Sequence, residues 1–425
     1  MKIRVLWNKT VSIFRDLIYS IEYLESCRRN ENDFTRNRKM PFPELILFML
    51  NLVRTSSQIA LNRFFQDIKG SEVHMSQQSF SEARQKLKWE GCRLLLDKFV
   101  GWYYGLRPDY KRWKGYRLSA VDGSKQQLPS DPALRILYGT AGRGDSAVTG
   151  QGSTLYDVLN DIIIDARLEP ISTDERSLAF QHVEHLRSLP SFGKELVLFD
   201  RGYAGFELIQ AFLYEKYPIT FLFRLRSKFS VDIDNLPIGD HQFTLTNGEN
   251  SFDLRVVKFE LNTGEIEILL TNLWDKDLTL EDFKDLYFMR WGIEVKYNEL
   301  KHKLEIENFS GRTQTAILQD FFITAFLSNM VSLAVCAAQE EADEERQDKD
   351  NKYSYNINVN DAIGNFKDRF IKALLEDNNR KRAKQTTQII ELLKWSVVPE
   401  RPRRSVPRNP NPRKANFFHN RKSNC

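Results

Sequence analysis

Four polar residues in the segment YFMRWGIEVKYNELK have a spacing that suits them to act on a single phosphate group. They are separated by three, four and seven residues, which are close to whole numbers of helical turns: Tyr287, Arg290, Glu294 and Lys301. A helix would carry their side chains on one narrow stripe. Arginine and lysine bind phosphate oxygens, and a carboxylate is a ligand for a hard cation. The spacing therefore predicts a phosphate site beside a metal site.

The apolar residues of this segment fall on the opposite side of the expected helix: Met289, Ile293, Leu300 and Leu304. This pattern predicts an amphipathic helix whose polar stripe is held away from the core. The alternative is a solvated helix surface on which Arg290 and Glu294 form an i,i+4 ion pair. Gly292 lies inside the helix and costs about 1 kcal/mol relative to alanine.

Two aspartates upstream follow predicted strands. The stretch YRLSAVDGSKQQLP predicts a strand over residues 116–121 that ends at Asp122, before a turn that begins with glycine. The stretch ELVLFDRGYAG contains the apolar run 196–199, which ends at Asp200 and suits a strand buried on both faces. Each acid is therefore expected at a strand tip.

The pattern Tyr-x2-Arg-x3-Glu-x6-Lys resembles the YREK signature of the insertion-sequence-4 family of DDE transposases, and LKHKLEIENFSG after it is similar to that family too. The resemblance spans roughly residues 76–312. It implies that Asp122, Asp200 and Glu294 are the catalytic acids and the ligands of two Mg²⁺ ions about 4 Å apart, for which Mn²⁺ can substitute. Asp122 would bridge both ions. The resemblance also assigns residues to the phosphates of the DNA end: Tyr287, Arg290 and Lys301.

The elements between the aspartates predict the fold. GQGSTLYDVLNDIIIDARLEP suggests a hairpin of two strands, and TDERSLAFQHVEHLRSL a helix capped by Thr173 or Asp174. Strand, strand, strand, helix, strand is the order of a ribonuclease-H-like sheet, which the resemblance also implies. The expected fold class is α/β: a ribonuclease-H-like mixed sheet with flanking helices, a β-rich insertion before the third acid, and a helical N-terminal domain.

The insertion is predicted because 94 residues separate Asp200 from Glu294, more than one helix and one strand require. Residues 229–276 suggest short strands, with a hairpin turn at Asn262-Thr263-Gly264. Such an insertion is typical of the family that the chain resembles, where it contributes to handling the cleaved end. Trp274 at its edge has two interpretations. It packs within the domain, which we favour, or it stacks on an unpaired base.

Residues 1–105 are largely helical in pattern, with helices expected over 11–27 and 43–52 and a third opened by Ser79 or Ser81. The resemblance implies that this domain recognises terminal inverted repeats, and the alternative is a plain helical bundle. The predicted domains are a helical DNA-binding domain, a two-part catalytic domain, the β-rich insertion, an acidic linker with C-terminal helices, and a basic disordered tail: 1–105, 106–228 with 277–340, 229–276, 341–398 and 399–425.

Composition fits this scheme. The 425 residues have room for two or three domains, and 41% hydrophobic residues suffice for a sizeable core. The four cysteines have no metal-ligand or disulfide spacing, which favours a reducing cytoplasm. The N-terminus lacks a secretory signal. The apolar run 321–338 is interrupted by polar residues and followed by acids, so it predicts a core helix and not a membrane span.

Charge is divided along the chain. Residues 1–100 carry 17 basic and 11 acidic groups, residues 399–425 carry eight and one, and with a total of +5 the remainder is −8. Basic ends with an acidic centre suit an enzyme that holds a nucleic-acid backbone and binds metal in a carboxylate cluster. The basic tail is equally consistent with a solubilising segment.

Other acids and the histidines compete for the metal role. Three aspartates are assigned to turns and strand pairing, because in a hairpin their spacing of four does not place them on one face: Asp157, Asp161 and Asp165. Three histidines lack metalloprotease spacing and are expected on the surface: His182, His185 and His302. No phosphate-binding loop, GxSxG elbow or GxGxxG turn is present, so no nucleotide cofactor and no serine hydrolysis is expected.

The resemblance implies a DNA transposase that cleaves the ends of its element and joins them to target DNA by two-metal hydrolysis and transesterification. It further implies a hairpin intermediate, a homodimeric synapse, and a prokaryotic, nucleoid-associated cytoplasmic location without a membrane. Close approach of the DNA backbone would explain Gly292. Two alternatives share the fold: a nuclease that only hydrolyses, and a noncatalytic DNA-binding derivative.

Overall fold

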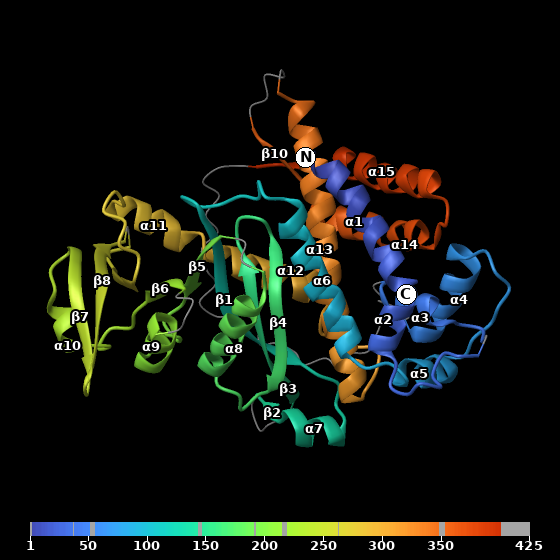
Figure 1. The fold of residues 1–425 in the computed structure, drawn as a ribbon, viewed down its shortest axis with the longest axis horizontal. Helices are drawn as coiled ribbons and strands as arrows, with labels where there is room; N and C mark the ends of the chain where they lie inside the picture. Colours follow the sequence, from blue (N-terminus) through green and yellow to red (C-terminus); the bar gives the residue numbers. More distant parts are fainter. Residues whose placement is uncertain are drawn as a thin grey trace. The chain divides into compact units, whose positions relative to one another are not determined.

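The computed structural model describes residues 2–36, 38–51, 56–142, 147–190, 193–214, 219–261, 263–347 and 353–400 (Figure 1). The turn residue Asn262 and residues 401–425 of the predicted tail lie outside this part of the chain. The chain divides into two compact units. We call Pro108–Gln126 with Gly150–Asn298 the sheet unit, and Met1–Arg107, Gln127–Thr149 and Glu299–Cys425 the helical unit.

A mixed sheet forms the core of the sheet unit. β1 (Tyr116–Gln127) pairs in parallel with β5 (Lys194–Phe199), which pairs in parallel with β6 (Thr220–Arg224). On the other side of β1 lies the antiparallel hairpin of β3 (Ala147–Asp157) and β4 (Ile162–Pro170). The order β4-β3-β1-β5-β6 with these directions is ribonuclease-H-like, so the predicted fold class is confirmed.

The β-rich insertion extends this sheet instead of forming a separate one. After α9 (Phe206–Tyr214), β6 and α10 (Val231–Asn235), it contains three antiparallel strands: β7 (Gly239–Asn247), β8 (Asn250–Glu260) and β9 (Ile266–Thr271). β9 pairs with β6, with Leu222 opposite Thr271. Leu269 and Leu270 are adjacent in β9 and fully buried, so this strand is covered on both faces.

Helices cover both faces of the sheet. α8 (Glu175–Ser188) crosses the strands (Figure 1) and begins at Asp174, whose carboxylate accepts hydrogen bonds from two backbone N–H groups. Ser153 of β3 contacts α8, whereas Thr154 contacts α12 (Trp291–His302). Because successive strand residues point to opposite faces, α8 and α12 lie on opposite sides of the sheet.

The segment that contains Tyr287 to Lys301 was expected to form one helix, and this prediction was wrong. α11 (Leu280–Phe288) starts with a capping box at Thr279 and ends before Met289, and α12 starts at Trp291. Across the break, Arg290 N donates to Tyr287 O and Ile293 N to Arg290 O, each over three residues instead of four. The helical segment is therefore interrupted by a tight turn at Met289 and Arg290.

The helical unit combines N-terminal and C-terminal helices. Its elements are α1 (Ile3–Ile18), α2 (Ile21–Cys27), α3 (Phe42–Met49), α4 (Ser57–Arg63), η1 (Phe64–Ile68), α5 (Gln77–Gln85), α6 (Glu90–Leu106), α7 (Pro132–Tyr138), β2 (Thr140–Ala141), α13 (Gln314–Glu344), β10 (Tyr355–Ile357), α14 (Val359–Leu375), α15 (Asn379–Trp395) and β11 (Val397–Pro399). The expected helix 11–27 is two helices, the second capped by Ser20. The cap of α5 is Ser76, not Ser79 or Ser81, because Ser76 Oγ accepts from Ser79 N at 3.2 Å.

α13 is the central helix of this unit. It is long and apolar enough to cross a membrane, yet 89% of its most apolar window is buried in protein. Phe322 stacks on Trp89 with ring centroids 5.4 Å apart, and Phe326 packs on Phe14 at 4.8 Å. The predicted core helix is therefore confirmed.

Candidate active site

Asp122 and Asp200 are neighbours on adjacent parallel strands. Val121 of β1 is the register partner of Phe199 of β5, and both side chains are fully buried. The two acids are the next residues of the two strands, whose spacing is about 4.8 Å. Asp122 was expected at a strand tip, but β1 continues to Gln127 beside β3. Asp122 instead lies where the pairing with β5 ends, which leaves its side chain partly accessible.

The backbone at Asp122 is held from both faces of the sheet. The Tyr297 hydroxyl donates to the Asp122 carbonyl at 2.7 Å, and Ser153 Oγ lies 3.4 Å from the same oxygen. Gly123 N donates to Asp122 Oδ1 at 2.9 Å, which sets the direction of the carboxylate. The position of this acid thus depends on β3 and α12 as well as on its own strand.

Glu294 lies on α12, one turn before Tyr297, and its charge acts on Asp122. Its Oε1 accepts a hydrogen bond from Arg290 Nη2 at 2.8 Å. Burial raises the pKa of Asp122 to about 6, Arg290 opposes the rise, and the charges of Glu294 and Asp200 add to it. The three predicted acids therefore share one electrostatic environment.

Tyr287 and Arg290 lie in the interior of the sheet unit. Each is only 4% exposed, so the expectation that the polar stripe is held away from the core was wrong for these two residues. The Tyr287 hydroxyl donates to Asp200 Oδ1 at 3.1 Å, and burial raises the pKa of this phenol, so it stays a neutral donor. Burial opposes the charge of Arg290, but Tyr287 and Asp200 raise its pKa.

Lys301 belongs to the last turn of α12, which is grouped with the helical unit. Its Nζ lies 3.6 Å from Glu307 Oε1, an ion pair within that unit. Both groups are partly exposed. Its predicted contact with DNA stays a prediction.

The donor set fits a hard divalent cation, since all three candidate ligands are partly exposed carboxylates. Among the described residues, no three His, Cys, Asp or Glu side chains are grouped closely enough to hold one ion. Glu294 is paired with Arg290 in this arrangement, and the raised pKa of Asp122 reflects negative charge that a cation would neutralise. Within the part of the chain that the structure describes, the Tyr203 hydroxyl and Arg290 Nε are buried without a hydrogen-bond partner. These groups have hydrogen-bonding capacity left for a ligand.

The structure corrects the expectation for His182, which was placed on the surface. It is fully buried, with Nδ1 2.8 Å from Asp165 Oδ2 and Nε2 2.9 Å from Ser153 Oγ. A Ser-His-Asp chain of this kind can serve as a nucleophile, but Ser153 is only 1% exposed and no substrate reaches it. Since Ser153 also contacts the Asp122 carbonyl, the chain is a structural support of the site. The buried relay carries no sequence motif that identifies it.

The other two aspartates of the hairpin take the expected roles. Asp157 Oδ1 accepts from the N–H groups of Leu159 and Asn160 in the turn, and Asp161 pairs with Lys296 at 2.6 Å. Trp274, for which packing was favoured, is 45% exposed and is not a core residue. Gly292 faces Val158 within the sheet unit, where an added Cβ would lie 3.5 Å from Val158 Cβ.

Comparison with known proteins places these residues in context. The model of the transposase DDE domain family matches residues 113–330, which include both aspartates and the segment from Tyr287 to Lys301. The chain is 22% identical over 312 residues to the transposase InsG for insertion sequence element IS4 of Escherichia coli, with 69% of each chain covered. Among solved structures it resembles the piggyBac transposase synaptic complex with hairpin DNA, at 12% identity and a TM-score of 0.45, covering 89% of this chain and 85% of that one.

Proposed function

Since the chain belongs to the transposase DDE domain family, we propose that Asp122, Asp200 and Glu294 are the acids with which it cuts and joins DNA. It is a DNA transposase, a metal-dependent enzyme of DNA cleavage and strand transfer. The observation that supports this assignment best is the register of β1 and β5, which makes Asp122 and Asp200 neighbours while the charge of Glu294 acts on Asp122.

The three carboxylates would hold two Mg²⁺ ions, for which Mn²⁺ can substitute. Divalent ions bound at such a site lower the pKa of an attacking water and neutralise charge on the phosphate. Glu294 would hold metal in place of its present ion pair with Arg290. The guanidinium of Arg290 is then available to a phosphate oxygen of the DNA end, for which its fork of donors is suited.

The buried phenols orient the acids. Tyr287 keeps its proton, because burial raises its pKa, and donates to Asp200 Oδ1. That bond leaves Asp200 Oδ2 for a ligand. Tyr297 anchors the backbone of Asp122 through its carbonyl. We propose that Arg290 and Lys301 position phosphates, so losing either weakens DNA positioning more than metal binding. Tyr287 lies beside them, and its loss would also release Asp200.

DNA is the substrate of this enzyme, and we propose terminal inverted repeats and a target duplex as its two forms. The predicted N-terminal domain, 1–105, would recognise the repeats, and two copies of the chain would form the synapse. The β-rich insertion, 229–276, would handle the cleaved end, with Trp274 exposed enough to stack on a base. The proposed location is the prokaryotic cytoplasm at the nucleoid.

The test is strand cleavage and strand transfer on DNA that carries the ends flanking this coding sequence. We expect Mg²⁺-dependent nicking and joined products with the wild-type chain, and a loss of at least a hundredfold in Asp122→Asn, Asp200→Asn and Glu294→Gln, with DNA binding retained. Nicking without joined products would indicate a hydrolytic nuclease. Binding without nicking in the wild type would indicate a noncatalytic derivative. Activity retained in all three variants would refute the assignment of the acids.

A further inference from the structure

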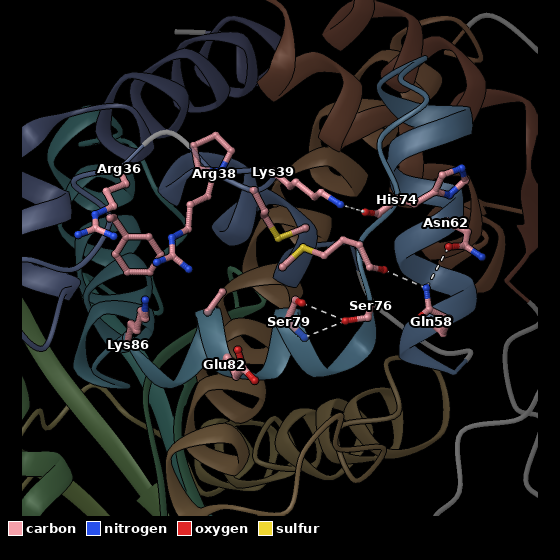
Figure 2. Close-up of a pocket in the computed structure, with 15 residues that line it drawn as sticks. Arg36, Arg38, Lys39, Gln58, Asn62, His74, Ser76, Ser79, Glu82 and Lys86 are labelled. Carbon is pink, nitrogen blue, oxygen red and sulfur yellow. Dashed lines mark hydrogen bonds between the residues drawn. The ribbon is translucent and has the colours of Figure 1, made fainter.

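The helical unit contains a cavity of about 880 Å³ on its N-terminal side (Figure 2). We call it the N-terminal pocket. Loop residues before α3 form one wall, and the α4 region together with the start of α5 forms the other. Its size lies within the range of small-ligand pockets, roughly 300–1,000 Å³. Its position is distant in sequence from the three acids, and all of its lining residues belong to the helical unit.

The rim of the N-terminal pocket is strongly basic. Four cations line it against one acid, Glu82, which gives a net charge of +3: Arg36, Arg38, Lys39 and Lys86. Arg36 and Arg38 are exposed and form no hydrogen bond or ion pair with the described residues. Figure 2 shows their guanidinium groups on the same side of the pocket as Lys86. Two unpaired guanidinium groups at one opening form an anion-binding rim, and arginine suits phosphate.

One part of the pocket wall is apolar, and the rest is lined by amides, hydroxyls, charged groups and a histidine. Met40 and Met75 are 3% and 8% exposed, and Pro41 and Ala83 line the space beside them. Phe34 also lines it, with a backbone φ of 63° that is uncommon for a residue with a side chain, and its ring packs on Phe42 at 5.6 Å. Methionine and phenylalanine give a soft, flat-sided surface that suits a planar ring.

Hydrogen bonds fix the walls. Gln58 on α4 donates to Met75 O at 3.0 Å and accepts from Gln77 N at 2.9 Å, so it ties α4 to the start of α5. Lys39 Nζ donates to His74 O at 3.1 Å and links the loop to the opposite wall (Figure 2). The pocket is therefore formed before any ligand binds, which reduces the ordering cost of binding.

We propose that the N-terminal pocket binds one unpaired nucleotide of DNA, with the base against Met40 and Met75 and the adjacent phosphates at Arg36 and Arg38. This inference rests on the proposed function, since DNA is the polyanion that the enzyme handles. In a paired duplex the phosphates face outward and the bases are stacked inside. Such a duplex could contact the basic rim with its backbone, but its bases could not contact Met40 and Met75. An unpaired nucleotide offers both a charged backbone and a planar apolar ring.

The first experiment removes the rim charges. The double variant Arg36→Ala/Arg38→Ala is compared with Arg380→Ala/Lys381→Ala, which removes two exposed cations from α15 of the same unit. Fluorescence anisotropy with a labelled duplex that contains one unpaired nucleotide is measured in EDTA. We expect the rim variant to bind on the order of tenfold to thirtyfold more weakly at 0.1 M salt, and its salt slope to fall by roughly 1.4, because two single-strand phosphate contacts are lost. Equal losses in both variants would overturn the proposal.

The second experiment fills the apolar part of the pocket and keeps every charge. Ala83 is only partly buried, so Ala83→Phe should fold, which thermal unfolding checks. We expect it to lower affinity for the duplex with the unpaired nucleotide at least fivefold and to leave affinity for the fully paired duplex unchanged. If Ala83→Phe has no effect and Arg36→Ala/Arg38→Ala weakens both DNAs alike, the rim contacts duplex backbone only and the nucleotide pocket is refuted.

These experiments distinguish failure of the pocket proposal from failure of the proposed function. Both binding measurements are made without divalent metal, so they do not depend on the three acids. Asp122→Asn should keep the preference for the unpaired nucleotide while losing cleavage. An active transposase without this preference would refute the pocket alone.

Discussion

At the scale of single residues, the site depends on where each charge lies relative to the protein interior. Asp122 is partly buried beside Glu294 and Asp200, so its pKa rises although Arg290 is near. Arg290 is almost fully buried and stays charged, because its neighbours are phenolic or acidic. Repulsion among the three carboxylates is partly offset by the positive charge of Arg290. A bound divalent metal would neutralise more of that repulsion.

The first prediction concerns the stability of the metal-free chain. The folded pKa of Asp122, about 6, lies above its ordinary value of 3.8. The folded state therefore binds the proton more tightly, and this stabilisation is complete below about pH 4 and lost as pH rises through 6. Asp122→Asn removes the penalty of ionisation, so we expect it to be about 1–2 kcal/mol more stable than wild type at pH 8 in EDTA.

Urea unfolding at pH 8 and at pH 4.5 measures this effect. The gain should shrink at the lower pH, where Asp122 itself is largely protonated. Asp232→Asn, an exposed aspartate of the same unit, serves as the control and should change neither value. A variant Asp122→Asn that is less stable than wild type at pH 8 would contradict the inferred environment.

At the scale of elements, one strand, β3, supports the site from both faces of the sheet. β3 places Ser153 toward α8 and Thr154 toward α12, and both side chains take part in holding β1 at Asp122. Gly152 precedes them in β3 and allows close approach to β1, since an added Cβ would lie 2.9 Å from Ser124 O. The site is thus supported through contacts between elements that are far apart in sequence.

The second prediction concerns the buried relay. His182→Gln alters the chain of Asp165, His182 and Ser153, and an unsatisfied buried polar group costs about 1–3 kcal/mol. Burial lowers the pKa of His182, so the folded state prefers the neutral ring. The wild-type chain therefore keeps its full stability above about pH 6.5 and loses stability as the pH falls below that value. We expect His182→Gln to be less stable at pH 8 and to lack this pH-dependent loss.

Thermal or urea unfolding between pH 5 and 8 checks the relay. The matched control is His302→Gln, because His302 is exposed, and it should leave the profile unchanged. An unchanged profile in His182→Gln would show that the ring is not held neutral. Cleavage activity at 20 °C should fall less than in Asp122→Asn, since the relay supports the acid and does not touch substrate.

At the scale of the whole molecule, the excess positive charge is concentrated at the two ends of the chain. Residues 401–425 carry eight basic and no acidic residues, whereas β11 ends at Pro399 and Glu400 N donates to Ser354 O. Truncation after Glu400 should therefore leave the described helices intact. We expect it to weaken nonspecific duplex binding and to reduce the salt slope by several units, if each lost cation contacts a phosphate.

Salt-dependent binding of the full and truncated chains measures the role of this tail. Equal thermal unfolding of the two chains is the control for folding. The same affinity and slope in both would assign the tail to solubility. A lower slope with retained specificity for the element ends would assign it to backbone contact.

The sequence by itself determined the chemistry and the class of the protein. Asp122 and Asp200 directly follow strand residues whose apolar character is local. The helical spacing of Tyr287, Arg290, Glu294 and Lys301 is visible in the sequence, and the resemblance to the YREK signature gives it a function. The order of strands and helices along the chain follows from the same local patterns, because turns, caps and periodicity depend on neighbouring residues. These features needed no knowledge of distant contacts.

Only the tertiary structure decided how those residues face one another. Tyr287 is buried against Asp200, the pairing of β6 with β9 merges the insertion into the sheet, and His182 is buried by partners 17 and 29 residues away. Periodicity describes one element at a time, whereas burial and hydrogen-bond partners arise between elements. The N-terminal pocket is of this second kind, since the residues that form it come together only when the chain folds.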